Sequence, residues 1–337
     1  MCKQLWWEIL VSVLLAGCAT MSSSSPPREE ITQLTQALEV KATWRYLEQL
    51  GRVNTVGVRL LKALPQDTPT RPTPYYGWML AKPVHPFAPA FGLQPSDVGV
   101  LIVGITPESP AAQAGLVPGD QMLTIHHVPV LDPREVSRVI RAQGVEQPVA
   151  IDYQRADTRH QTVVTPAWLP ATVRFHVLNH QDMTAGASGQ TIVVTSGLLR
   201  FMTSDDELAI VLGHELAHVL LGHVPRATPR DLLSGLIGGT FGLGSEVIVP
   251  GSGGPVSQQL MQLLRGHFAS DLERAADAVG LRYAWQAGFD VARGVKIWER
   301  LAIEVPETLH TSLLSTHPTS AERLLRLETL AEELTSP

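Results

Sequence analysis

The segment SDDELAIVLGHELAHVLLG, residues 204–222, carries the main fold signal in the second half of this chain. It opens with a capping signal, because Ser204 can accept a hydrogen bond from the third helical amide while Glu207 reaches back to the cap. Three acidic residues in the first turn suit the positive end of a helix dipole. Apolar residues then continue without proline, so the stretch predicts a helix that contains Leu208–Leu221 and stops at Gly222.

Two histidines of this helix are spaced for binding one metal ion. His214 and His218 are four residues apart, which places both imidazoles on one face, one turn apart. Glu215 lies about 100° around the helix from His214, where its carboxylate can reach a water at the metal without being a ligand. This is the position of a general base. The alternative interpretation is a helix with incidental surface histidines.

A hydrolytic zinc site needs three protein ligands and one open position, so a third ligand must come from elsewhere. The best candidate is Glu273, in a second predicted helix that runs from Ser270 through Trp285. Asp277 lies on the same face and can accept a hydrogen bond from the distal nitrogen of a zinc-bound histidine. In the alternative, Ser270 and Glu273 form another capping box, and Glu273 faces solvent. Two histidines at the edges of helix signals are weaker rival ligands: His223 and His267.

Three motifs together resemble a known family: the HExxH helix, a downstream Glu-x-x-Ala-Asp at 273–277, and Thr316-His317-Pro318. They are similar to the zinc metallopeptidase family that includes HtpX, BepA and the CaaX prenyl proteases. The resemblance covers about 171–334, and residues 195–199 and 286–290 also match. It implies that His214, His218 and Glu273 bind one zinc ion per chain and that Glu215 activates water.

The resemblance also implies roles for two late residues. His317 and Arg323 match positions that face the scissile carbonyl in the family. His317 is therefore expected either to stabilise the oxyanion or to close the open zinc position in a resting state. One departure concerns the edge strand that holds substrate, which is usually Asn-Ala-Phe-like and here is Thr184–Ala187. This departure leaves substrate alignment open.

Residues 76–168 show a different sequence pattern, in which short runs typical of β-strands are separated by turns. Within them, Ser109–Leu116 followed by Pro118–Asp120 resembles a bacterial PDZ domain of the type found in periplasmic proteases. A PDZ domain takes an extended peptide onto a sheet edge beside a helix. The alternative is a PDZ fold that only packs against its neighbour.

The resemblance places the parts of this groove. The edge is expected at Gly99–Ile105, and the partner helix at Pro133–Ala142, with Asp132 as its cap. The amides of three residues are expected to face a ligand carboxylate: Gly99, Val100 and Leu101. One departure is His126-His127, which stands where such domains usually have an Asn-Gly-like turn.

The N-terminus predicts export. Residues 1–17 read as a signal peptide, because a single Lys3 precedes an apolar run too short to span a bilayer. Leu15–Cys18 resembles the bacterial lipobox, which implies a lipid-anchored Cys18 at the periplasmic face, and Ala19 then favours the outer membrane. The alternatives are an ordinary signal peptide or an N-terminal membrane helix with an incidental cysteine. A tether over 18–28 precedes a helical segment over 29–65, read as one helix or as two broken near Gly51.

The composition limits the classes of protein and of binding site that this chain can represent. The 337 residues are 44% hydrophobic and 17% charged with a formal net charge of -6, which is typical of a globular protein and gives no basic footprint for nucleic acid. The chain has two cysteines. Cys2 is expected to leave with the signal peptide and Cys18 to carry the lipid, so no thiol remains for a disulfide or a thiolate metal site. The glycine-rich segment 232–254 is read either as a mobile lid over the cleft or as a buried packing segment.

These observations predict an α+β protein. A mostly helical zincin-type peptidase domain with a small sheet, residues 171–337, follows an N-terminal helix and a PDZ-like β domain at 76–168. The expected function is that of a membrane-anchored zinc metalloendopeptidase that hydrolyses unfolded or mis-assembled cell-envelope proteins, with an envelope partner in the PDZ groove. The alternative is a non-catalytic PDZ lipoprotein with a binding or chaperone role, in which the zinc site is structural or plugged by His317.

Overall fold

The computed structural model describes residues 25–65, 68, 71–84, 86–94, 98–224, 245–246, 269–306 and 321–336. The chain divides into two compact units, one up to Glu39 and the other from Val40 onward. Within the described ranges, no helix has the length and apolar character needed to cross a membrane.

The first helix, α2, runs unbroken from Arg28 to Lys62 and passes through Gly51. The expected alternative of two helices is therefore wrong, because a single glycine costs a helix only about 1 kcal/mol and the turns after it are buried. In the first unit, three residues at helical spacing are exposed: Ile31, Leu34 and Leu38.

The buried part of α2 closes one edge of a three-stranded sheet. Strand β11 (Thr191–Thr195) lies at the centre, parallel to β9 (Arg174–Leu178) and antiparallel to β10 (Ala185–Ser188). The outward carbonyls of β9 accept hydrogen bonds from α2, with Tyr46 bonding Val177 and Asn54 bonding Phe175. Strand β10 forms the opposite edge of the sheet and contacts α7.

The predicted metal helix is α7, Asp205–Leu220, which follows the short helix α6 (Ser196–Phe201). The Ser204 hydroxyl accepts a hydrogen bond from the amide of Glu207, as expected for a cap. The Glu207 carboxylate accepts from the amide of Thr203, one residue earlier than the capping box predicts. Two arginines from other helices bind this first turn: Arg52 of α2 binds Asp205, and Arg300 of α12 binds Glu207.

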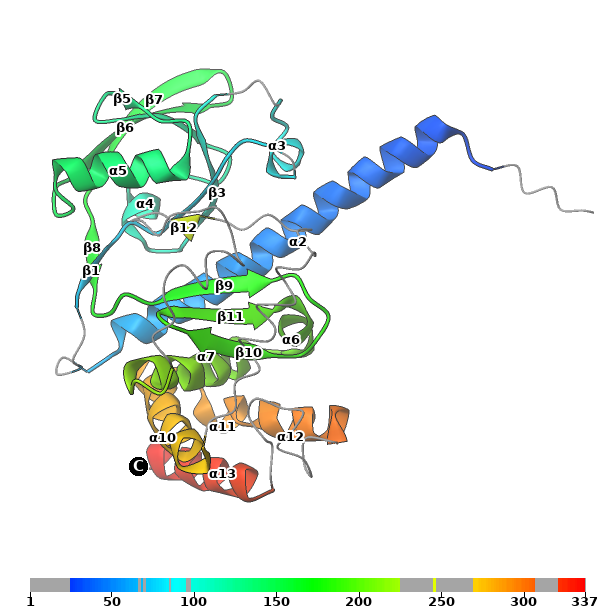
Figure 1. Ribbon diagram of the computed structural model, residues 1–337, viewed down its shortest axis with the longest axis vertical. Helices are drawn as coiled ribbons and strands as arrows, with labels where there is room; N and C mark the ends of the chain where they lie inside the picture. The colour runs from blue at the N-terminus through cyan, green and yellow to red at the C-terminus, as the bar shows by residue number, and fades with distance from the viewer. Residues whose placement is uncertain are drawn as a thin grey trace, which may run out of the picture. The chain divides into compact units, whose positions relative to one another are not determined.

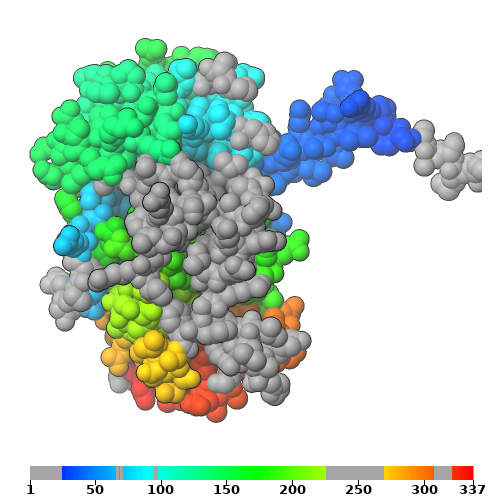
Figure 2. Space-filling view, viewed as in Figure 1, coloured from blue at the N-terminus to red at the C-terminus, as the bar shows by residue number. Residues whose placement is uncertain are grey.

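The described residues after α7 contain four more helices of this part of the chain. They are α10 (Ser270–Gln286), α11 (Val291–Gly294), α12 (Lys296–Glu304) and α13 (Ala321–Thr335). Helix α10 packs on α7 and on α13 (Figure 1), and the atoms of α10 and α13 also adjoin in the space-filling view (Figure 2). At the crossing of α7 and α10, a Cβ atom on Gly280 would lie 2.6 Å from the carbonyl oxygen of Gly213. The two backbones therefore touch where these glycines meet.

The PDZ-like part is a sheet in the order β12-β2-β3-β4-β6-β7, with β5 paired to β4. Its strands are β2 (Trp78–Ala81), β3 (Val100–Ile105), β4 (Gln121–Ile125), β5 (Val128–Pro129), β6 (Val149–Arg155), β7 (Thr158–Val164) and β12 (Ser245–Glu246). A separate ribbon pairs β1 (Thr73–Tyr75) with β8 (Ala167–Leu169). Three helices accompany the strands: α3 (Phe87–Ala90), α4 (Pro110–Gln113) and α5 (Pro133–Gln143).

The expected peptide-binding edge at Gly99–Ile105 is wrong. Strand β3 lies between two neighbours, since Leu101 pairs with Ala81 of β2 and with Gln121 of β4. Strand β2 was not predicted, because its four residues are all buried and show no alternation of polar and apolar side chains.

The expected partner helix is present as α5 and lies beside β2. The Lys82 ammonium, after β2, binds Asp132, the N-cap of α5. At the other end, the Tyr76 hydroxyl donates to the carbonyl of Val145. Helix α5 therefore runs along β2 in the opposite direction.

The doubtful turn at His126-His127 does form between β4 and β5. Both histidines have positive φ, 48° and 64°, as the two central residues of a type I′ hairpin require. The helices, the small sheet and the PDZ-like strands together confirm the predicted α+β class.

Candidate metal centre

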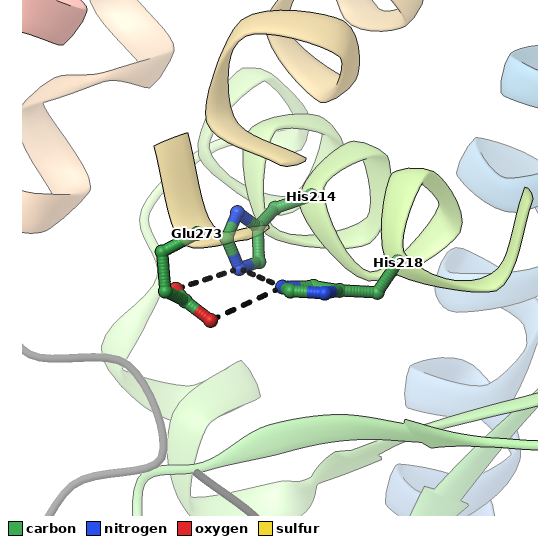
Figure 3. A group of neighbouring side chains, drawn as sticks. All are labelled: His214, His218 and Glu273. Atoms are coloured by element: carbon green, nitrogen blue, oxygen red, sulfur yellow. Dashed lines mark hydrogen bonds and ion pairs between the residues drawn. The ribbon is translucent and has the colours of Figure 1, made fainter. Parts of the chain in front are cut away.

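Side chains from α7 and α10 converge on one point, and all three are buried. The Nε2 atoms of His214 and His218 are 3.1 Å apart. The Glu273 carboxylate closes the triangle, with Oε2 at 3.5 Å from His214 Nε2 and Oε1 at 3.3 Å from His218 Nε2 (Figure 3). The alternative of surface histidines is wrong, since the exposed fractions of His214 and His218 are 2% and 0%.

These separations fit a zinc ion. Zinc bonds of about 2.0–2.1 Å in tetrahedral geometry place neighbouring donor atoms about 3.3–3.4 Å apart. The three observed separations, 3.1–3.5 Å, lie around this value, with a different oxygen of Glu273 facing each histidine. Two imidazoles and one carboxylate form a donor set that zinc prefers, and three ligands leave the fourth tetrahedral position for water or substrate.

The inward direction of Glu273 follows from how α10 begins. The N-cap of this helix is Ala269, which makes no side-chain cap, so the alternative capping box of Ser270 and Glu273 is wrong. Glu273 is instead only 7% exposed, although a lone buried carboxylate would be costly. The close crossing at Gly213 and Gly280 brings α10 near enough for Glu273 to reach the histidines.

Behind His214 lies a buried carboxylate. Asp277 Oδ1 is 2.9 Å from His214 Nδ1, and the same carboxylate accepts from Arg323 and Arg326 of α13 at 2.7 and 2.8 Å. Burial would raise the pKa of Asp277, but the Arg323 charge and the bond from His214 hold that pKa well below its usual range. The ionised Asp277 therefore accepts the Nδ1 proton of His214 and leaves the Nε2 lone pair facing the other two donors.

The position of Arg323 differs from what the resemblance implies. Its Nε and Nη2 atoms bind Asp277, and its guanidinium stacks 4.0 Å from the centre of the Trp298 ring. Arg323 is buried among these partners, on the α13 side of His214. This contact connects α13 to His214 through the carboxylate of Asp277.

Behind His218 lies another histidine. The Nδ1 atoms of His218 and His223 are 3.1 Å apart. Burial first, and then the charge of His218, lowers the pKa of His223, which favours its neutral form. The rival ligand His223 thus contacts the distal nitrogen of His218 and does not join the three converging donors.

Comparison with known proteins places this chain in a family. The sequence profile described as Peptidase family M48 matches residues 154–331, more than half of the chain. The chain belongs to peptidase family M48. A second profile, PDZ domain, matches residues 84–165 of this M48 chain. The two matches overlap, so the predicted domain boundaries stay predictions.

Several curated relatives resemble this M48 chain. The mitochondrial metalloendopeptidase OMA1 of Danio rerio is 32% identical over 209 residues, which cover 57% of this chain and 41% of that protein. OMA1 of Saccharomyces cerevisiae is 28% identical, covering 44% of each chain. The β-barrel assembly-enhancing protease of Escherichia coli K12 is 26% identical, covering 48% of this chain and 34% of that protein. The chain thus spans less than half of the length of these relatives.

The family assignment confirms two predictions. The resemblance to this metallopeptidase family and to a PDZ domain is borne out by the two profiles. M48 metalloproteases use zinc, so the predicted cofactor is confirmed together with the His-His-Glu cluster that can hold it.

The general-base candidate of this M48 chain, Glu215, is buried on α7 directly after His214, with 1% of its surface exposed. Three predicted features lie outside the described residues: Cys18, His317 and the rival ligand His267. The segment 232–254 also lies outside them, apart from Ser245 and Glu246, so neither interpretation of it is tested.

Sequence reasoning missed residues that support the site. Arg326 was not singled out, although it lies one turn from Arg323 on α13 and binds the same carboxylate. Gly213 and Gly280 were missed as well. One signal was available, since each glycine lies inside an otherwise strong helical pattern, where a packing reason is the usual explanation.

Proposed function

We propose that this M48 chain is a zinc metalloendopeptidase that hydrolyses peptide bonds of polypeptide substrates. The main supporting observation is that two imidazoles of α7 and one carboxylate of α10 converge at tetrahedral spacing. The buried Glu215 lies beside them. Relatives named metalloendopeptidase and protease support the same reaction class.

In the proposed mechanism, each residue has one role. When bound, zinc supplies a Lewis acid that polarises a carbonyl and lowers the pKa of water toward neutrality. His214, His218 and Glu273 would hold the ion. The Glu215 carboxylate takes a proton from the attacking water and then passes it to the leaving amine nitrogen.

Two further residues complete the proposal. His317 would stabilise the oxyanion or close the open zinc position, and this rests on the Thr-His-Pro match in the sequence. Arg323 would act through Asp277, because its guanidinium binds that carboxylate, and Asp277 orients His214. The charge and tautomer of the first histidine would thus depend on α13.

The PDZ-like part is proposed to bind an extended segment of polypeptide. The strand β2 and the helix α5 are the pair that fits this mode, because α5 lies along β2 through the contacts of Lys82 and Tyr76. The outer edge of β2 is paired in this structure with the two residues of β12. The proposed docking position is therefore β2 instead of Gly99–Leu101, and a bound segment would take the place of the short strand β12. An envelope protein remains the proposed partner.

The proposed location is the cell envelope, with a lipid anchor at Cys18 on the periplasmic face of the outer membrane. The lipobox-like Leu15–Cys18 supports this anchor. A relative named β-barrel assembly-enhancing protease supports an envelope role. Unfolded or mis-assembled envelope proteins are accordingly the proposed substrates.

Cleavage of an unfolded protein by the purified, zinc-loaded chain tests the reaction. Glu215→Gln removes the base but keeps the shape, so we expect kcat to fall by roughly 10²–10⁴-fold while zinc stays bound. Glu304→Gln, at an exposed position of α12, is the matched control and should cleave like the wild type. Full cleavage by a zinc-loaded Glu215→Gln variant would reject the mechanism. A wild type that binds zinc and cleaves nothing would favour the non-catalytic alternative.

A further inference from the structure

The two histidines of the metal centre are supported in different ways. His214 is bound by the carboxylate of Asp277, at 2.9 Å. The distal nitrogen of His218 lies 3.1 Å from Nδ1 of His223, and the two rings meet nearly edge to face at 70°. The support of His218 therefore comes from a residue just beyond the end of its own helix.

The end of α7 explains why these two rings meet. Gly222, with φ of 74°, turns the chain back, and its amide donates to the carbonyl of Val219. The amide of His223 then donates to the carbonyl of His218, at 3.0 Å. This pair of bonds is the Schellman motif, which places the second residue after the helix against the residue five positions earlier. That contact is commonly hydrophobic, and here it joins two imidazoles.

We propose that His223 is a positioning residue for His218, an inference that rests on the proposed zinc site. Two nitrogens 3.1 Å apart form a hydrogen bond only if one donates and the other accepts. A zinc ligand that binds through Nε2 keeps its proton on Nδ1, so His218 donates. His223 accepts through Nδ1, carries its own proton on Nε2, and holds the plane of the His218 ring toward the ion.

The geometry also separates this role from that of a fourth ligand. The Nε2 atom of His218 faces His214 and Glu273, whereas its Nδ1 atom faces His223. His223 therefore contacts the side of the imidazole that points away from the other donors. The open position of the metal stays free for water or substrate.

Two substitutions separate the hydrogen bond from the packing. In His223→Asn, the amide oxygen lies near the position of Nδ1 and can accept from His218, whereas His223→Leu fills space but cannot accept. Both variants keep the backbone bond between His223 and His218. Leu221→Gln, an exposed change in the same turn, is the matched control.

The main measurement is zinc affinity by competition with a chromophoric chelator, with the visible spectrum of the cobalt-substituted protein as a second readout. We expect a loss of about 10–100-fold in zinc affinity and an altered cobalt spectrum for His223→Leu. His223→Asn and the Leu221→Gln control should stay close to the wild type. Thermal unfolding of the metal-free proteins should be alike in all four.

Each contrary outcome has one meaning. Wild-type zinc affinity in His223→Leu would overturn the positioning role, and so would equal losses in the Leu and Asn variants. If the wild type binds no zinc, this inference and the proposed function fail together. If the expected affinity pattern appears but no variant cleaves protein, the positioning role stands and the peptidase proposal fails.

Discussion

At the scale of single residues, the metal centre depends on groups that do not touch the ion. Asp277 is a buried carboxylate that faces one imidazole and two guanidinium groups. Such a pair is costly to break, since removal of one partner leaves the opposite charge buried and uncompensated. The same contacts that orient His214 therefore also hold α10 and α13 together.

Substitution of Asp277 tests this double role. Asp277→Asn keeps the shape but leaves Arg323 and Arg326 without their carboxylate, so we expect a loss of about 3–5 kcal/mol in the free energy of unfolding. Zinc affinity should fall by about 10–100-fold, because His214 loses its acceptor. Urea unfolding and chelator competition measure the two effects. Asp271→Asn, an exposed change on the same helix, should alter neither, and equal losses in both variants would contradict the assignment.

A second residue predicts how stability changes with pH. Burial first, and then the nearby charge of Arg174, lowers the pKa of His176 on β9 from 6.5 to about 4. Because the unfolded chain binds this proton more readily, the stabilisation is complete above pH 6.5 and is lost as pH falls toward 4. Between pH 7 and pH 5 we expect His176 to contribute a loss of up to about 2 kcal/mol. Urea unfolding of His176→Gln should show a smaller decrease over this range, and an equal decrease would refute the prediction.

At the scale of elements, the helices were predictable and their crossing was not. The cap of α7 and the apolar periodicity of α7 and α10 are local, so the sequence indicated both helices and the face that carries His214, His218 and Glu273. The contact of Gly213 with Gly280, and that of Arg326 with Asp277, join residues far apart in the chain. No local pattern encodes such a pairing. Strand β2 was missed for another reason, since four buried residues show no period.

The crossing of α7 and α10 gives a prediction for Gly280. In Gly280→Ala the new Cβ would lie 2.6 Å from the carbonyl oxygen of Gly213 and from the amide nitrogen of His214, so the helices must separate. We expect a loss of about 1–3 kcal/mol in the free energy of unfolding, as for other overpacked positions. Zinc affinity should also fall, because Glu273 moves away from the histidines.

The control for this prediction is another helical glycine. A Cβ on Gly51, inside α2, would meet no atom within 4 Å. Gly51→Ala should therefore raise the free energy of unfolding by about 0.5–1 kcal/mol, from helix propensity alone. Thermal or urea unfolding distinguishes the two variants. A stabilising Gly280→Ala would show that the helices do not cross at this point.

At the scale of the whole molecule, the described chain is a PDZ-like part followed by an M48 part. The sequence indicated this order because each part carries a compact motif of its own, Ser109–Asp120 in one and the HExxH helix in the other. It did not indicate which strand lies at the edge of the PDZ-like sheet, because strand order depends on pairings between distant segments.

Removal of the metal has a consequence for the folded protein as a whole. A ligand at one hundred times its Kd adds about 2.7 kcal/mol to the free energy of unfolding, so chelation should lower the Tm of the zinc-loaded protein. Glu215→Gln should keep this shift, because Glu215 is not a proposed ligand. His218→Leu should abolish it. Differential scanning calorimetry with and without chelator measures the shift, and an equal Tm in both states would argue against a stoichiometric zinc site.

The closed side of the three-stranded sheet has one more implication. Side chains of Tyr46 and Asn54 already occupy the outward carbonyls of β9. Among the described strands, β10 is thus the border at which a foreign extended segment can lengthen this sheet, and β10 contacts the helix that carries His214 and His218. Because α2 covers the β9 edge, we expect an incoming extended chain to approach the metal centre along β10.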